Sequence, residues 1–192
     1  MRYKSDHKGK ARALILGAAG RRLRKDGYDG VGVHGLMEDA GMTTGAFYSH
    51  FSCKEELLLE VLREGLEDIR GKLDLRVSAG EPIWIDLVLT KYFSKRHCIE
   101  IEDSCILPAL TVDAARAGDS AKALFHQYMV QLVDRMMKGL RDKEASDARA
   151  RAWTVLSLMV GAVTIARALP SGEAQDELLT SVRQISKLIT HS

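Results

Sequence analysis

The chain has 192 residues, of which 46% are hydrophobic and 28% are charged, an ordinary composition for a globular protein with a sizeable core. This length suits one large domain, or a small domain joined to a larger one. The longest uncharged apolar stretch, residues 152–166, would reach only about 22 Å as a helix. A membrane span needs about 30 Å, so the sequence argues against one and favours a buried helix there.

The net charge of +2 hides a strong asymmetry along the chain. Residues 1–25 contain nine Lys or Arg and one acidic residue, Asp6, so they carry +8, and the remainder carries −6. A basic end on an acidic body suggests nucleic-acid contact through the N-terminal segment. A merely solvated run of charges is the alternative from charge alone.

The three cysteines are Cys53, Cys98 and Cys105. Their number is odd, none lies in a C-x-x-C motif, and the first 25 residues lack the apolar core of a signal peptide. We therefore expect a reducing, cytoplasmic location. Cys98 and Cys105 are seven residues apart and could share a helix face, either as a redox pair or as two unremarkable thiols.

Nearly the whole chain is predicted to be helical, since prolines are few and apolar residues recur at helical spacing. The first helix carries a stripe of Ala11, Leu14, Ile15, Ala18 and Ala19. It ends near Lys25, where Gly27 can supply a left-handed residue. The further helices are expected at about 34–40, 44–50, 53–75, 83–95, 108–118, 120–143, 148–169 and 173–190.

Two helix boundaries carry specific signals. Ser52 and Glu55 have the spacing of a capping box, with Ser52 as N-cap of the helix that follows. The segment 77–82 contains Ser, Gly and Pro and is predicted to be a boundary between domains. The polar stretch 97–106 is assigned to no element.

The two short helices at 34–40 and 44–50 have the dimensions of a helix-turn-helix, joined at Gly41. Leu36, Met37, Ala40, Met42, Phe47 and Phe51 can supply their shared core. No Lys, Arg, Asp or Glu occurs from Thr43 to Phe51. The surface of the second helix is therefore made of hydroxyl-bearing, small and aromatic residues.

These residue types suit DNA. Hydroxyl groups bond phosphates or base edges, and a threonine methyl can contact a thymine methyl. Small residues let the backbone approach the groove, and a lysine in the first turn of the next helix is explained by an external anion, because a cation there opposes the helix dipole. The expected DNA-binding residues are Thr43, Thr44, Gly45, Ala46, Tyr48, Ser49, His50 and Lys54.

The run from Ala40 to Leu57, with its Gly-Met-Thr-Thr-Gly-Ala-Phe-Tyr-Ser-His-Phe core and Lys-Glu-Glu-Leu helix start, resembles the signature of the TetR family of bacterial regulators. The specific motif covers about residues 10–60. Gly32 and Gly35 depart from it, since that family usually begins this helix with Ser or Thr. The resemblance implies an all-helical fold, a homodimer built from the last two long helices, and an inducer cavity in the C-terminal domain.

We therefore expect an all-α chain with a three-helix DNA-binding domain at 1–52, a connecting helix at 53–75, and a helical bundle for ligand binding and dimerisation at 76–192. Aromatic and Met residues suggest an apolar ligand site. Its candidate residues are Trp84, Tyr92, Phe93, Leu110, Phe125, Tyr128, Met129 and Met159. A plain hydrophobic core is the alternative for each of them.

The predicted function is a ligand-responsive transcriptional regulator, a repressor released from a palindromic DNA operator by a small hydrophobic molecule. No catalytic motif, zinc signature or cofactor motif occurs, so neither an enzyme nor a cofactor or metal is expected. The irregular cluster of His97, Cys98, Glu100, Glu102, Asp103 and Cys105 is the only one that resembles a metal site. A helical adaptor with little DNA affinity is the main competing hypothesis, and an uncharacterised small-molecule-binding protein or enzyme is a further one.

Overall fold

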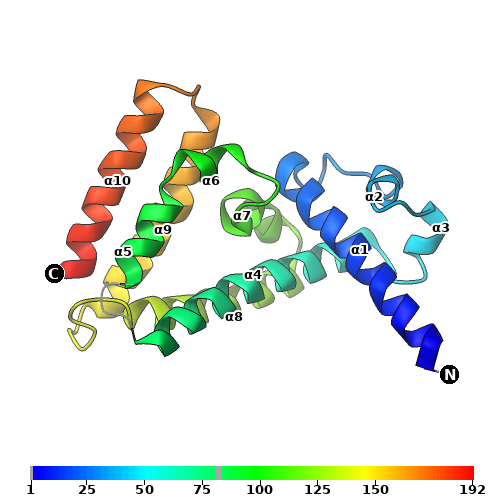
Figure 1. Cartoon of the computed structure of the whole chain (residues 1–192), viewed down its shortest axis with the longest axis horizontal. Coiled ribbons are helices and arrows are strands. Elements are labelled where there is room, and N and C mark those ends of the chain that lie inside the picture. Colours follow the sequence, from blue (N-terminus) through cyan, green and yellow to red (C-terminus); the bar gives the residue numbers. More distant parts are fainter. Residues whose placement is uncertain (1, 81–83) are drawn as a thin grey trace. The chain divides into compact units, whose positions relative to one another are not determined.

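The computed structural model describes residues 2–80 and 84–192, with side chains from residue 8 onward. All regular structure in these residues is helical, as the sequence predicted. Figure 1 shows the helices in chain order. Their bounds are α1 Arg2–Asp26, α2 Val33–Asp39, α3 Thr44–Phe47, α4 Lys54–Ala79, α5 Trp84–Tyr92, α6 Lys95–Ile99, α7 Ile106–Arg116, α8 Asp119–Met137, α9 Ala148–Ala168 and α10 Glu173–His191. Within the described ranges, no helix combines the length and the apolar character that a membrane span requires.

The chain folds into two compact units, and each is assembled from two segments. The first comprises residues up to Gly65 and Ile101–Phe125, and the second comprises Leu66–Glu100 and His126–Ser192. The long helices α4 and α8 contribute residues to both. The functional boundary that we expect between residues 52 and 76 stays a prediction, because these units describe packing alone.

In the first unit, α1 packs against α2 and α7. Its buried face contains Ile15, Ala18 and Ala19, as the apolar stripe predicted. Leu14, which we assigned to the same stripe, is 59% exposed, and Leu16 is buried instead. The helix ends where Gly27 adopts a positive φ of 71°, which a residue without a side chain accommodates most easily.

In the second unit, α9 and α10 run side by side, and α5 packs against α10 while α6 packs against α9. The face that α10 buries is largely polar: it consists of Gln175, Leu179, Ser186 and Thr190. The apolar face that the sequence indicated (Leu178, Val182, Ile185 and Ile189) is half-buried, apart from Ile185, which is 51% exposed. The helix therefore buries mostly polar side chains within the chain. Part of its apolar surface stays exposed to solvent.

Several helix ends differ from the sequence expectation. α4 continues to Ala79, and α8 ends at Met137 rather than near residue 143. The helix expected at 83–95 ends at Tyr92 as α5, and a separate helix, α6, extends into the stretch that was assigned to no element. α6 begins after Ser94, whose side chain accepts a hydrogen bond from the His97 backbone N–H. The expected first residue of the 83–95 helix, Ile83, lies outside the described residues.

The capping box is shifted by one residue. Both the backbone N–H and the hydroxyl of Ser52 donate to the Glu56 carboxylate, at 2.6 and 2.7 Å, instead of Glu55 serving this role. The cause is the start of α4 at Lys54, which makes Glu56 the third helical residue. These hydrogen bonds also lower the pKa of Glu56.

Glycine packing generates a stability prediction. A Cβ on Gly139 would lie 2.5 Å from Cζ2 of the buried Trp84, whereas a Cβ on Gly71, inside α4, would meet no atom within 4 Å. Gly139→Ala should destabilise the fold by about 1–3 kcal/mol, because the rigid indole must move. The matched control Gly71→Ala should stabilise it by about 0.5–1 kcal/mol, since alanine favours helix. Equal changes in the free energy of unfolding of the two variants, measured in urea, would contradict this account.

Candidate DNA-binding surface

An apolar core holds α2 and α3 together. Leu36 and Met37 of α2 are buried, and so are Phe47 and Phe51, whose ring centroids lie 5.6 Å apart. The connection is tight: the Met42 N–H donates to the Met37 carbonyl at 2.8 Å, and the intervening Gly41 has a φ of 69°. The sequence predicted this turn and most of this core.

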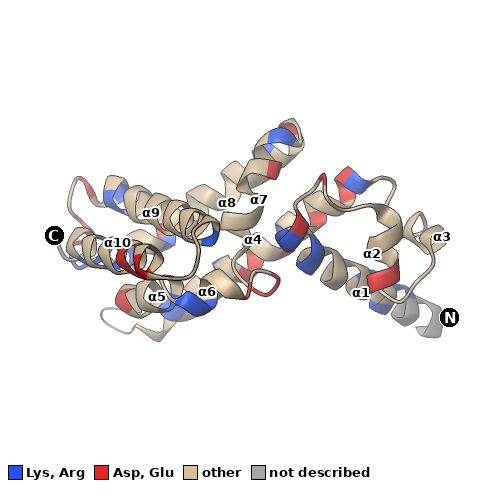
Figure 2. Ribbon diagram, turned by 90° about the horizontal axis from the view of Figure 1, so that it is seen from above, with Lys and Arg blue, Asp and Glu red and all other residues tan. Residues whose placement is uncertain are grey.

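The second helix is shorter than predicted. α3 spans only Thr44–Phe47, and the chain continues in turns in which the Ser49 and His50 N–H groups donate to carbonyls three residues earlier. The outward residues are Thr43, Gly45, Tyr48 and Ser49, with Tyr48 64% exposed. Figure 2 shows Lys and Arg on α1, acidic residues on α2, and neither sign on α3.

The remaining predicted contacts are half-buried, and one already has a partner. Ala46 and His50 are half-buried, and the His50 Nδ1 atom is shielded from solvent with no hydrogen-bond partner in the described chain. The hydroxyl of Thr44 lies 3.2 Å from Nδ1 of His34 on α2. The sequence analysis missed His34, because a contact across the turn depends on the packing angle of the two helices.

Lys54 lies at the start of α4, and its ammonium has an internal partner. Its Nζ donates to the Tyr28 carbonyl at 2.5 Å and lies 4.0 Å from the centre of the Tyr28 ring. Burial, followed by a hydrogen bond with Glu55, raises the pKa of the Tyr28 hydroxyl. The cation that we attributed to an external anion is therefore at least partly explained by the 27–30 turn, which the sequence analysis did not connect with it.

A basic residue of α1, Arg12, also packs against this core. The Arg12 guanidinium lies 4.9 Å from the Phe51 ring centre and pairs with Glu60 of α4 at 3.0 Å. Lys8 and Lys10, one turn earlier, are exposed. The basic character of α1 thus has two uses, since some of its cations fix the packing of the first unit while others face solvent.

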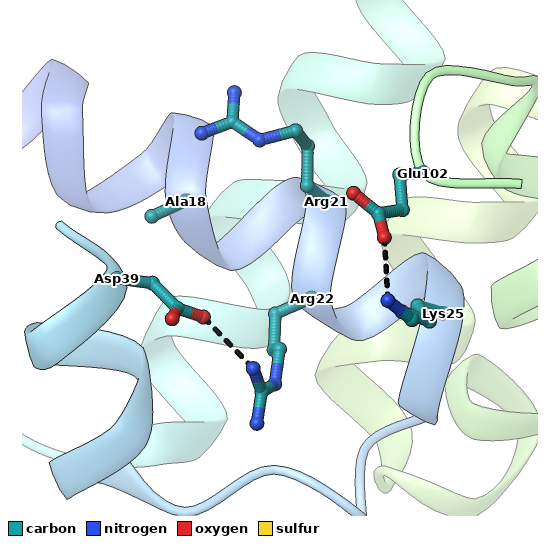
Figure 3. A pocket seen from close by; sticks show the side chains of 6 residues that line it. All are labelled: Ala18, Arg21, Arg22, Lys25, Asp39 and Glu102. Carbon is teal, nitrogen blue, oxygen red and sulfur yellow. Dashed lines mark hydrogen bonds and ion pairs between the residues drawn. The ribbon is translucent and has the colours of Figure 1, made fainter. Parts of the chain in front are cut away.

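A polar pocket of about 300 Å³ lies along the C-terminal half of α1 (Figure 3). It is lined by Ala18, Arg21, Arg22, Lys25, Asp39 and Glu102. Arg22 pairs with Asp39 of α2 at 3.1 Å, and Lys25 pairs with Glu102 at 2.8 Å and lowers the pKa of that carboxyl. These ion pairs, and the Tyr28 N–H that donates to Asp113 of α7 at 3.1 Å, fix α1 within the first unit.

Most of the predicted ligand-site residues are buried, but they do not all belong to one unit. Trp84, Phe93, Tyr128, Met129 and Met159 are buried and Tyr92 is half-buried, all in the second unit. Leu110 and Phe125 belong to the first unit. The Tyr128 hydroxyl donates to Glu67 of α4 at 2.9 Å. That these residues line a ligand site stays a prediction.

The cysteine and metal hypotheses have a simple structural outcome. Cys53 is exposed, Cys98 is buried and Cys105 is intermediate, and none of the three forms a disulfide within the described residues. Burial raises the pKa of Cys98, which makes its thiol less reactive. Within residues 2–80 and 84–192, no three His, Cys, Asp or Glu side chains lie close enough to hold a metal ion.

The internal role of Lys54 gives a prediction that separates folding from DNA contact. Lys54→Ala should lower the free energy of unfolding by about 1–2 kcal/mol, because it removes a charged hydrogen bond and a cation–π contact. The control Lys72→Ala removes an exposed pair with Asp68 and should change it by less than about 0.5 kcal/mol. Thermal and urea unfolding measure both. Identical curves for Lys54→Ala and wild type would mean that the Tyr28 contact contributes nothing.

Comparison with known proteins finds similarity in sequence and in fold. Residues 15–61, from α1 into α4, match the family model described as bacterial regulatory proteins, tetR family. The chain is 27% identical over 156 residues to the HTH-type transcriptional regulator LmrA of Bacillus subtilis, which covers 79% of this chain and 83% of that protein.

Solved structures share the fold over nearly the whole chain. A TetR-family regulator from Cytophaga hutchinsonii superposes with a TM-score of 0.70 at 20% identity, covering 97% of this chain and 98% of that one. FadR from Bacillus subtilis, in complex with stearoyl-CoA, superposes with a TM-score of 0.68 at 17% identity, covering 93% and 97%. Residues 15–61 are thus similar to the TetR family of bacterial regulatory proteins, and the solved structures show that the chain shares their fold.

Proposed function

We propose that this chain is a ligand-responsive transcriptional regulator that binds a palindromic operator as a homodimer and is released from it by a small hydrophobic molecule. The observation that carries the proposal is the uncharged outer surface of residues 43–49, at and around α3, which presents Thr43, Tyr48 and Ser49 over the Phe47–Phe51 core. It lies within the segment that matches the family model. The alternative of an adaptor without DNA affinity assigns no use to this surface.

The side chains on this surface are proposed to contact different parts of the DNA. Thr44, at the start of α3, would reach a base edge, and the Tyr48 hydroxyl would hold a phosphate. Lys54 can still contribute, because an ammonium has three N–H donors and the Tyr28 carbonyl accepts only one of them. The exposed Lys8 and Lys10 would add attraction that is independent of sequence.

The proposed dimer uses the outer faces of α9 and α10. Exposed apolar residues there are Trp153 and Ile165 on α9, and Ile185 and Leu188 on α10. Apolar surface on the last two helices favours a self-complementary interface with two-fold symmetry. A dimer of this symmetry would bind an inverted repeat.

The effector part of the proposal is supported by the apolar and aromatic side chains of the second unit and by a relative of similar fold. FadR was crystallised with stearoyl-CoA. LmrA, a relative similar in sequence, is a transcriptional regulator by name, and we therefore propose a non-catalytic role for this chain.

The DNA-binding proposal predicts different effects at two positions. Thr44→Ala should weaken binding to an operator selected from random duplexes by about 1 kcal/mol, with a smaller loss on scrambled DNA, because a base contact is removed. Tyr48→Phe should weaken both duplexes similarly, because a phosphate contact carries no sequence information. Melting curves control for folding. The melting temperature of Tyr48→Phe should match that of wild type, because Tyr48 is largely exposed. Wild-type affinity of both variants for both duplexes would favour the adaptor hypothesis.

The dimer proposal predicts the effect of a buried charge. Leu188 is 66% exposed in the single chain, so Leu188→Glu should leave the helical fold intact while placing a charge in the proposed interface. Sedimentation should then show the mass falling from twice 21.2 kDa toward 21.2 kDa. Leu75→Glu on α4, at a position 73% exposed, is the control and should stay dimeric. A wild-type chain that sediments as a monomer at micromolar concentration would refute the proposal.

A further inference from the structure

His34 and Thr44 contact each other across the turn between α2 and α3. His34 is the second residue of α2, and Thr44 is the first residue of α3. Nδ1 of the His34 ring lies 3.2 Å from the hydroxyl oxygen of Thr44, a hydrogen-bond distance. His34 is exposed, and it makes no ion pair and no other hydrogen bond within residues 2–80 and 84–192. Neither burial nor charge pairing therefore accounts for this side chain, which leaves the contact with Thr44.

The Thr44 hydroxyl likewise has a single partner in the part of the chain that the structure describes. A threonine inside a helix commonly donates to the carbonyl three or four residues earlier. Thr44 begins α3, so the residues three and four positions before it lie outside this helix, and the usual bond is not formed. His34 is thus the residue that fixes the orientation of this hydroxyl.

The core beneath the two helices holds this contact in place. Leu36 and Met37 of α2 and Phe47 of α3 are at most 1% exposed. A Cβ on Gly45, the residue after Thr44, would meet no further atom within 4 Å. The two side chains therefore have a firm support, while the space beside Thr44 is open to an approaching molecule.

The bond to His34 restricts what the hydroxyl can recognise. A free hydroxyl rotates, so it can donate through its O–H or accept through its lone pairs. A neutral imidazole has one N–H and one acceptor nitrogen, and in water the tautomer with its hydrogen on Nε2 is favoured. Nδ1 is then the acceptor, and the Thr44 hydroxyl donates to it. The Thr44 oxygen retains only lone pairs for an outside group, which must be a donor.

Donor groups distinguish the bases in the major groove of DNA. Adenine presents its N6 amino group and cytosine its N4 amino group, whereas guanine and thymine present carbonyl oxygens at the corresponding positions. An oxygen that can only accept a hydrogen bond binds an amino group and is repelled by a carbonyl oxygen. A hydroxyl that rotates freely accommodates both, so an oriented hydroxyl discriminates better between bases.

We propose that His34 is a positioning residue for DNA recognition: its Nδ1 accepts the O–H of Thr44 and thereby directs the Thr44 oxygen to an amino group of adenine or cytosine. His34 itself contacts no base in this arrangement. The inference rests on the proposed DNA-binding function, because it assigns the base chemistry that the same surface recognises.

The first test needs no DNA and uses NMR of the full chain with isotope-labelled histidine. The Nδ1 resonance of His34 should be that of an unprotonated ring nitrogen. Thr44→Val should shift it, because valine keeps the shape of threonine without the hydroxyl. His126 is the matched control: it is exposed on α8, has no hydrogen bond or ion pair within the described ranges, and should not respond. A protonated Nδ1, or no shift in Thr44→Val, would overturn the proposal.

The second test measures base discrimination on the operator selected from random duplexes. A transition at the base pair that Thr44 contacts exchanges an amino group for a carbonyl oxygen. It should weaken binding of the wild-type chain about fivefold, which corresponds to one net hydrogen bond. That base pair is identified as the one at which Thr44→Val removes the penalty.

Variants of His34 then show whether it acts through Thr44. In His34→Phe the transition penalty should fall below about twofold, while the affinity for scrambled DNA stays within about twofold of wild type. His34→Asn should retain most of the discrimination, because its amide oxygen can accept in place of Nδ1. His126→Phe should behave as wild type, and melting curves control for folding.

The double variant completes the comparison. His34→Phe combined with Thr44→Val should lose no more discrimination than Thr44→Val alone, because both changes remove the same hydrogen bond. An additional loss would mean that His34 contacts DNA itself. Unchanged discrimination in His34→Phe would mean that Thr44 needs no positioning. Either result rejects the proposal.

The outcomes separate this inference from the proposed function. If the chain binds its operator selectively but Thr44→Val removes the penalty at no base pair, the inference fails while the regulatory function remains. If the chain shows no sequence-dependent DNA binding, the proposed function fails, and the inference fails with it.

Discussion

The burial of Phe47 and Phe51 is the constraint on which the candidate DNA-binding surface depends. α2 has seven residues and α3 has four, and helices this short do not persist alone in water. Their stability comes from packing, because α2 packs against both α3 and α1. With both rings turned inward, the chain between them must expose Tyr48 and Ser49. The same packing that stabilises the motif therefore selects its outer surface.

The cations of the first unit illustrate why charge alone is an incomplete guide to function. The sequence shows a basic segment and suggests nucleic acid, yet Arg12, Arg22 and Lys25 all pair with carboxylates of other elements. Lys54 contacts the turn after α1. Much of the positive charge thus positions helices, and the charge that remains available to DNA is smaller than the count of Lys and Arg.

Helical periodicity and glycine positions were sufficient to predict the all-helical fold, the turn at Gly41 and the extents of α9 and α10. The end of α3, the use of Glu56 as the cap partner and the split between α5 and α6 were not predicted, because single hydrogen bonds decide them. The polar buried face of α10 was missed because periodicity finds an apolar stripe but not what covers it. For the candidate site, sequence indicated the exposed residues of α3 but not His34 or Tyr28, whose contacts depend on tertiary packing.

The ion pairs along α1 also affect how salt dependence can be interpreted. Arg22–Asp39 and Lys25–Glu102 are partly exposed, and surface pairs of this kind weaken as dissolved ions screen them. Added salt would then act twice on a protein–DNA complex, once on the phosphate contacts and once on the ion pairs that hold Asp39 of α2 and Glu102 against α1. Both effects lower the affinity for DNA. The slope of affinity against ionic strength would accordingly set an upper bound on the number of phosphates neutralised.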